Sequence, residues 1–198
     1  TFIKANSARL HYIKDEANDF IHRAAEGFDE EHIVLSFSGG KDSTATADVV
    51  IKSLGNPSLV HIFGNTTLEF PLTYEYADRY REDHPLAIFK TAKNREQNFH
   101  DVCEDIGPPA RMLRWCCFMF KTGPITRVIN GLYRNQQILT FYGIRKSESV
   151  SRSKYNRRNK IEYCFGELRL MITRKSGLQS TYNGHCPDTK KKSCTYKS

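Results

Sequence analysis

The chain has 198 residues, enough for one compact α/β domain with a buried core and short for two. Lysine and arginine outnumber aspartate and glutamate by 30 to 22, and the net charge of +8 suits polyanionic nucleotides and is compatible with nucleic acid. The sequence has no apolar run of 18 residues and no charged-then-apolar leader pattern, so we expect a soluble, cytoplasmic protein with no membrane contact.

The first predicted element is an amphipathic helix over residues 7–26, with apolar side chains on one face and charges on the other. A short apolar run at 33–37 predicts a strand, and apolar positions at helical spacing predict a helix over 44–54. Small polar residues join the two. The order of strand, tight glycine-containing loop and helix is typical of an anion-binding site, in which the free N–H groups at the start of the helix bind the anion.

The joining loop is the strongest motif in the chain. Its spacing is neither that of the Walker loop nor that of the Gly-x-Gly-x-x-Gly dinucleotide turn. The loop resembles the PP-loop of the ATP pyrophosphatases, the adenine-nucleotide α-hydrolase superfamily, in which it holds the β,γ-pyrophosphate of ATP. An ordinary glycine-rich turn is the other interpretation. The resemblance implies that the nucleotide contacts are Ser36, Ser38, Gly39, Gly40, Lys41, Asp42 and Ser43.

A second strand is predicted at 59–63, followed by a polar turn and a helix that runs to about Arg81. Asn65 and Thr66 come directly after this strand, where α/β sheets bind ligands, so both are candidate site residues. The segment from Asn65 through Phe70-Pro71-x-Thr resembles the phosphoadenosine phosphosulfate (PAPS) reductase branch of the superfamily. For Phe70 and Pro71 themselves we expect packing and helix initiation rather than ligand contact.

Further on, a third strand is predicted at 86–89 and a helix at 97–106, in which Cys103 is expected to be a small buried hydrophobic residue. Six cysteines in a cytosolic nucleotide protein indicate thiol chemistry or a metal rather than disulfides. Cys116 and Cys117, followed by Lys121 and a proline, resemble the Cys-Cys-x-x-x-Lys-x-x-Pro segment of sulfonucleotide reductases.

In several of those reductases the cysteine pair supplies two ligands of an iron–sulfur cluster, and the lysine lies near the cluster and the nucleotide. The resemblance implies a [4Fe-4S] cluster here, for which four thiolates are needed. We assign Cys116, Cys117, Cys186 and Cys194, although the chain has no second Cys-x-x-Cys pair and Cys164 is also present. Inherited architecture without a metal is the alternative.

The last strong motif follows a strand predicted at 137–142. The segment Gly143-x-Arg145-x-x-Glu-Ser-x-x-Arg152 again resembles the PAPS reductase family, in which it lines the nucleotide site. Gly143 permits close approach of backbone, and both arginines can fork onto phosphate or sulfate oxygens. Past it, residues 162–173 are expected to form one strand or one helix.

These resemblances imply an α/β fold, a parallel twisted sheet with helices on both faces in a three-layer sandwich. We divide the chain into a nucleotide-binding domain at 1–160 and a divergent cysteine-containing segment at 161–198. The sequence begins at Thr1 rather than Met, which is compatible with a piece of a longer protein.

The complete loop and the missing Glu-Cys-Gly-x-His motif of true reductases make the pattern similar to the DndC-type proteins of DNA phosphorothioation. That resemblance implies ATP and Mg²⁺ as cofactors, attack on the α-phosphate with loss of pyrophosphate, and Lys41, Asp42, Arg145 and Arg152 as catalytic groups. A cysteine desulfurase and other DNA-modification subunits would be partners, with nucleic acid reached through them. Two alternatives stay open: a PAPS or APS reductase or sulfate adenylyltransferase of sulfur assimilation, and a non-catalytic nucleotide-sensing subunit of a defence complex.

Overall fold

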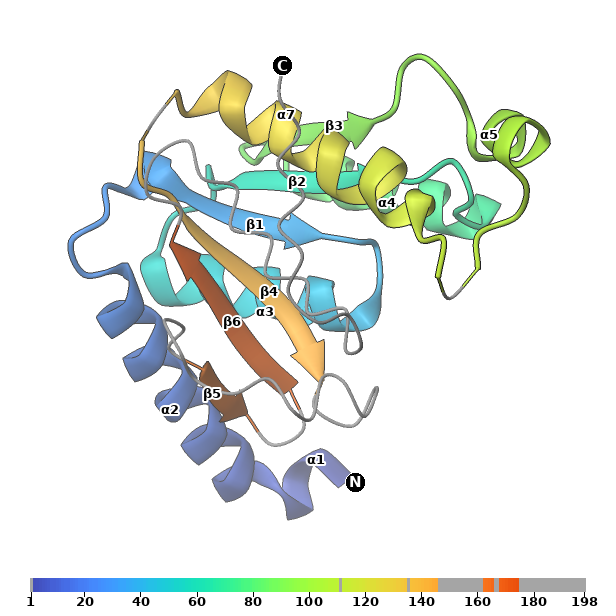
Figure 1. Cartoon of the computed structure of the whole chain (residues 1–198). Helices are drawn as coiled ribbons and strands as arrows, with labels where there is room; N and C mark the ends of the chain where they lie inside the picture. Colours follow the sequence, from blue (N-terminus) through green and yellow to red (C-terminus); the bar gives the residue numbers. More distant parts are fainter. Residues whose placement is uncertain (1, 111, 135, 146–161, 166–167, 175–198) are drawn as a thin grey trace.

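A computed structural model describes residues 2–110, 112–134, 136–145, 162–165 and 168–174. A six-stranded sheet runs through it in the order β3-β2-β1-β4-β6-β5 (Figure 1). The first four strands in that order are parallel, whereas β6 pairs antiparallel with β4 and with β5. The strands are β1 (Ile33–Phe37), β2 (Val60–Asn65), β3 (Ile88–Lys93), β4 (Leu139–Arg145), β5 (Glu162–Phe165) and β6 (Leu168–Arg174).

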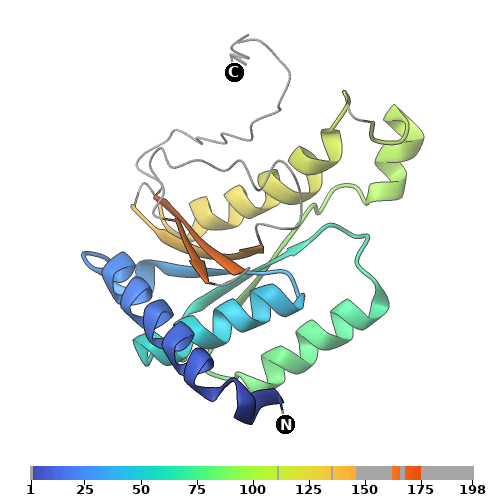
Figure 2. The same ribbon diagram turned by 90° about the horizontal axis from the view of Figure 1, so that it is seen from below.

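Helices cover both faces of the sheet (Figure 2). On one face lie α2 (Ser7–Ala25), α3 (Lys41–Leu54) and α4 (Pro71–Asp83), and on the other lies α7 (Gly123–Leu132). Right-handed crossovers explain this arrangement, because the chain moves from β1 to β2 to β3 in one direction and then returns to the opposite side of β1. The shorter elements are α1 (Phe2–Ala5), η1 (Glu30–His32), α5 (Phe99–Ile106), α6 (Trp115–Cys117) and the π-helix η2 (Phe118–Thr122).

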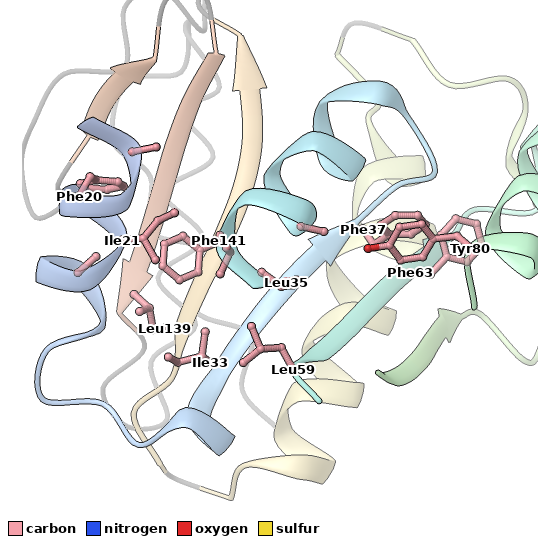
Figure 3. Packing of buried hydrophobic residues seen from close by; sticks show 14 of the residues in the cluster. Phe20, Ile21, Ile33, Leu35, Phe37, Leu59, Phe63, Tyr80, Leu139 and Phe141 are labelled. Atoms are coloured by element: carbon pink, nitrogen blue, oxygen red, sulfur yellow. The ribbon is translucent and has the colours of Figure 1, made fainter. Parts of the chain in front are cut away.

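The core follows from the alternation of side chains along the parallel strands. Leu35 and Phe37 of β1 point into the larger apolar cluster beneath α2, α3 and α4, where Phe37 stacks on Tyr80 with ring centroids 4.5 Å apart (Figure 3). Val34, one residue out of phase, packs into a second cluster beneath α7. The central strand is therefore buried on both faces, as the unbroken apolar run in its sequence requires.

The prediction of a parallel sheet with helices on both faces is confirmed for the four parallel strands and needs correction beyond β4. Residues 162–173, expected as one strand or one helix, contain β5 and most of β6, and these antiparallel strands extend the same sheet. The third strand lies at Ile88–Lys93 rather than 86–89, and α3 begins at Lys41, three residues before the predicted start. No helix in the described part of the chain is long and apolar enough to cross a membrane.

Candidate functional site

The loop between β1 and α3 is held in shape by its own hydroxyl groups. Ser43 is buried; its hydroxyl donates to the Gly40 carbonyl at 2.8 Å and accepts from the Ser38 amide at 3.2 Å. The Ser38 hydroxyl lies 3.1 Å from the Ser43 hydroxyl. Gly39 has a φ of +72°, a conformation that favours glycine. The predicted ligand contact Ser43 therefore also organises the loop from inside, while Ser38 and Gly40 are exposed.

The N-terminus of α3, which directly follows this loop, has no side-chain cap. Its N-cap residue is Gly40, with extended backbone angles, and no side chain caps the helix. The first N–H groups of a helix have no partner within it, so an uncapped start retains donors and a partial positive charge for an anion. Lys41, the first residue of α3, is exposed and adds a full charge. This arrangement fits the phosphates of a nucleotide.

Gly143 of β4 lies directly against the first turn of α3. A Cβ atom at this position would come within 2.6 Å of the Thr46 hydroxyl oxygen and 2.7 Å of the Asp42 carbonyl carbon. The Thr46 hydroxyl also donates to the Asp42 carbonyl oxygen at 2.8 Å. The close backbone approach expected at Gly143 thus occurs, and within the described chain its partner is α3.

The loop and the end of β4 meet at the point where the topology of the sheet reverses. The chain leaves β1 toward β2 and later enters β4 on the other side of β1, with α3 and α7 on opposite faces. In open α/β sheets such a switch point, at the carboxyl ends of the strands, is the usual ligand crevice. Arg145 ends β4 two residues after Gly143. Arg152 lies outside the described residues.

Asn65 and Thr66, at the carboxyl end of β2, belong to a small polar network. The Asn65 side-chain oxygen accepts from the Thr67 amide at 2.9 Å and from the Tyr74 hydroxyl at 3.0 Å. The Thr66 amide and hydroxyl donate to the Glu69 carboxylate at 3.0 and 2.8 Å, and the single proton of the Tyr74 hydroxyl is shared between Asn65 and Glu69, whose carboxylate lies 3.2 Å away. The network fixes the turn that follows β2.

Glu69 was not predicted as part of the site, although Thr66 and Glu69 have the Thr-x-x-Glu spacing of a capping box. Burial alone would raise the pKa of Glu69, but hydrogen bonds from Thr66 and Tyr74 outweigh it and lower that pKa. The pKa of Tyr74 is raised, first by burial and then by the neighbouring Glu69 carboxylate. Both shifts favour a charged Glu69 that accepts from neutral hydroxyls.

The structure confirms the prediction made for Pro71 and contradicts the one made for Phe70. Pro71 is the first residue of α4, as expected for helix initiation. The expectation that Phe70 serves in packing is wrong for this structure, because the residue is 79% exposed. The first turn of α4 lies instead beside the loop, where the Thr73 methyl group would be 3.0 Å from a Cβ atom on Gly39.

The cysteine pair lies in α6, against a third apolar cluster. Cys116 packs against Trp115 and Phe120 together with Cys103, which was expected to be a small buried hydrophobic residue and is partly buried in this cluster. Burial, followed by the neighbouring Cys117, raises the pKa of the Cys116 thiol. Cys116 and Cys117 are thus adjacent in the chain and both partly buried.

The rest of the predicted cluster set is untested. Cys186 and Cys194 lie outside the described residues, and no group of three or more His, Cys, Asp or Glu side chains that could hold a metal occurs within them. Lys121 is exposed in η2, just before α7. The first turn of α7 packs on the end of β2, where Ile125 would lie 3.4 Å from a Cβ atom on Gly64. Lys121 therefore lies at the same edge of the sheet as the loop.

Comparison with known proteins gives the family of the chain. The family model of the phosphoadenosine phosphosulfate reductase domain matches residues 32–169, more than half of the chain. An uncharacterized protein of Methanocaldococcus jannaschii is 31% identical over 161 residues, covering 81% of this chain and 32% of that protein. An adenosine 5'-phosphosulfate reductase of Staphylococcus epidermidis is 28% identical over 139 residues, covering 67% of this chain and 52% of the reductase.

Among solved structures, the phosphate complex of the PAPS reductase from Candida auris is 16% identical, with a TM-score of 0.44 over 58% of this chain and 55% of that one. The chain spans about a third to a half of the length of its curated relatives. On the family match, the chain belongs to the phosphoadenosine phosphosulfate reductase domain family.

Proposed function

We propose that the chain binds ATP at the 38–43 loop and activates an acceptor by attack on the α-phosphate, with release of pyrophosphate. The observation that carries this proposal is the uncapped start of α3 with exposed Lys41, beside a loop already held in shape by Ser43. A leaving pyrophosphate develops negative charge, and preorganised N–H donors with a nearby cation stabilise such charge.

Each candidate residue has a role in this scheme. The N–H groups of Gly39 and Gly40, with the Ser38 hydroxyl and Lys41, hold the departing pyrophosphate. Asp42 would orient the loop or hold Mg²⁺, which would neutralise phosphate charge when bound. Arg145 and Arg152 bind the α-phosphate or the acceptor through their forked donors.

The proposal extends to sulfur transfer in DNA phosphorothioation. The loop matches the PP-loop pattern in all six residues, and two adjacent thiols, Cys116 and Cys117, lie at the same edge of the sheet. With Cys186 and Cys194 they would hold a [4Fe-4S] cluster, and a cysteine desulfurase would supply the sulfur. An iron and sulfide assay on anaerobically purified protein, with its visible spectrum, tests the cluster.

A second candidate is reduction of a sulfonucleotide, favoured by the similarity to an adenosine 5'-phosphosulfate reductase. The two candidates release different products. ATP cleavage at the α-phosphate yields pyrophosphate, whereas reduction of PAPS or APS by a dithiol yields sulfite.

The test supplies the chain with Mg-ATP, or with PAPS or APS plus a dithiol, and measures pyrophosphate and sulfite. We expect pyrophosphate, and we expect Lys41→Ala to reduce its release by about 100-fold or more, since preorganised charge is worth that much. Lys52→Ala is the matched control, because Lys52 lies in the last turn of the same helix and pairs with Asp48 at 2.8 Å. Full activity in Lys41→Ala would refute the mechanism, and sulfite without pyrophosphate would establish the second candidate.

A further inference from the structure

The carboxyl edge of the sheet carries positive side chains without acidic partners. Lys93 ends β3 and pairs in register with Asn65, Arg95 follows two residues later, and Arg114 directly precedes α6. All three are exposed, and none forms an ion pair with another residue in the described ranges. The sequence contains no aspartate or glutamate between Asp105 and Glu148. That segment therefore adds positive and no negative side-chain charge to the fold.

Nearby carboxylates are mostly engaged within the fold. Glu69 accepts from Thr66 and Tyr74, and Asp101 accepts from the Asn98 amide at 2.9 Å as part of the capping box of α5. Asp105 accepts from the Gln97 side chain at 3.1 Å. Glu96, beside Arg95, is exposed. The three hydrogen-bonded carboxylates stay charged, but their hydrogen bonds hold them to neutral groups of the fold, and in the described ranges none of them pairs with Lys93, Arg95 or Arg114.

Apolar side chains are exposed at the same edge. Phe70, immediately before α4, is 79% exposed, and Phe118, immediately after Cys117, is 71% exposed. Leu72 and Met112 are similarly exposed. Topology groups them, because Phe70 and Leu72 lie at the start of α4, after β2, and Met112 and Phe118 lie between β3 and α7. Single exposed apolar residues are ordinary, but several at one edge mark an interaction site.

Cations interspersed with exposed aromatic rings match one class of partner. Phosphates bind Lys and Arg, and unpaired bases stack on aromatic faces without regard to sequence. A duplex hides those base faces, so the rings favour single strands or looped-out nucleotides.

We propose that the carboxyl edge binds single-stranded nucleic acid, with phosphates on Lys93, Arg95 and Arg114 and bases on Phe70 and Phe118. The inference rests on the proposed function and deepens it, because it makes a nucleic-acid strand the direct acceptor. The loop lies beside this surface: Thr73, three residues after Phe70, adjoins Gly39. A strand bound there reaches the nucleotide site.

Fluorescence anisotropy on the whole chain, without ATP, tests the surface with labelled single-stranded DNA, single-stranded RNA and their duplexes at several salt concentrations. We expect the single strands to bind more tightly than the duplexes. Lys93→Glu/Arg95→Glu should weaken single-strand binding about tenfold or more and lower the slope of log K against log[salt] by about 0.7 per lost phosphate contact. Phe70→Ala/Phe118→Ala should also weaken it about tenfold, with little change in that slope.

Lys52→Glu/Arg134→Glu is the matched control. It makes the same change in net charge at exposed positions near the opposite edge of the sheet, because Lys52 lies in the last turn of α3, ahead of β2, and Arg134 lies between α7 and β4. An equal loss of binding in this control would overturn the proposal, because net charge alone would then explain binding. Unchanged binding in the phenylalanine variant, or duplexes bound as tightly as single strands, would also overturn it.

Separate measurements of ATP binding and pyrophosphate release distinguish the two proposals. The edge variants should retain ATP binding while losing oligonucleotide binding, and Lys41→Ala should do the reverse. Oligonucleotide binding without any ATP cleavage would contradict the proposed function and not the surface. Comparison of the DNA and RNA strands identifies the source of the phosphodiester backbone.

Discussion

Replacement of Gly143 by alanine tests whether β4 and α3 are packed as closely as the structure indicates. The φ angle of Gly143 is not positive, so alanine can adopt its backbone conformation. Without a clash, the change would stabilise the chain by about 0.4–1 kcal/mol, because alanine lowers the conformational entropy of the unfolded chain. The added methyl group, however, would lie 2.7 Å from the Asp42 carbonyl carbon, a backbone atom that no side-chain rotation can move.

Overpacking of this kind costs about 1–3 kcal/mol, so we expect net destabilisation. For a chain of this size, each 1 kcal/mol lowers Tm by about 2–4 °C, and thermal unfolding followed by circular dichroism should detect the change. ATP affinity should fall as well, since the displaced turn begins the helix that faces the phosphates. Gly131→Ala is the control, because a Cβ atom there meets nothing within 4 Å in α7. A Gly143→Ala chain that melts at or above the native Tm would refute the packing argument.

Three further changes probe other parts of the fold. Phe120→Ala should destabilise the chain by about 3–5 kcal/mol in thermal unfolding, as a buried aromatic residue is lost, and should speed the reaction of Cys116 with a disulfide reagent, because burial holds its pKa high. Glu69→Gln should lower Tm most at neutral pH, where the Glu69 carboxylate of the native chain is charged. The difference in Tm between the native chain and the variant should vanish as the pH falls below 4.5 and through the lowered pKa of native Glu69. A Tm difference that does not change with pH would contradict this reasoning. Burial lowers the pKa of His61, so the unfolded chain takes up a proton first, and Tm should fall as pH drops below 6.5; His61→Gln should flatten that dependence.

The nucleotide loop could be predicted from sequence because its signals are local. An apolar run, two glycines and a helical pattern lie within a few residues of one another, and the structure has strand, loop and helix in that order. The inward role of Ser43 could not be predicted, because it depends on a hydroxyl reaching back to Ser38 and Gly40. The hydrogen-bond network around Glu69 could not be predicted for a similar reason, because Tyr74, which completes it, comes from the following helix.

The wrong predictions for other parts of the chain arose because contacts with distant segments decide those structures. β3 is an edge strand with one neighbour, so it tolerates exposed Lys90 and Lys93, and the apolar run that begins at Leu86 misplaced it. The antiparallel pairing of β6 with β4 depends on contacts between distant segments and has no periodic signature of its own. Exposure of Phe70 likewise reflects where α4 lies, because its sequence is equally suited to a core position.

The position of β1 also determines when the site can exist during folding. β1 pairs with β2 nearby in sequence, but its other neighbour, β4, is reached only by pairing Ile33 with Leu139 across about 105 intervening residues. Closing so long a segment costs conformational entropy and slows folding, so the β1–β4 contact should form late. Until then the nucleotide loop lacks the strand that supports the first turn of α3, and β1 exposes an unpaired edge. Under the proposed function, ATP would bind only the completed sheet and would stabilise it by mass action.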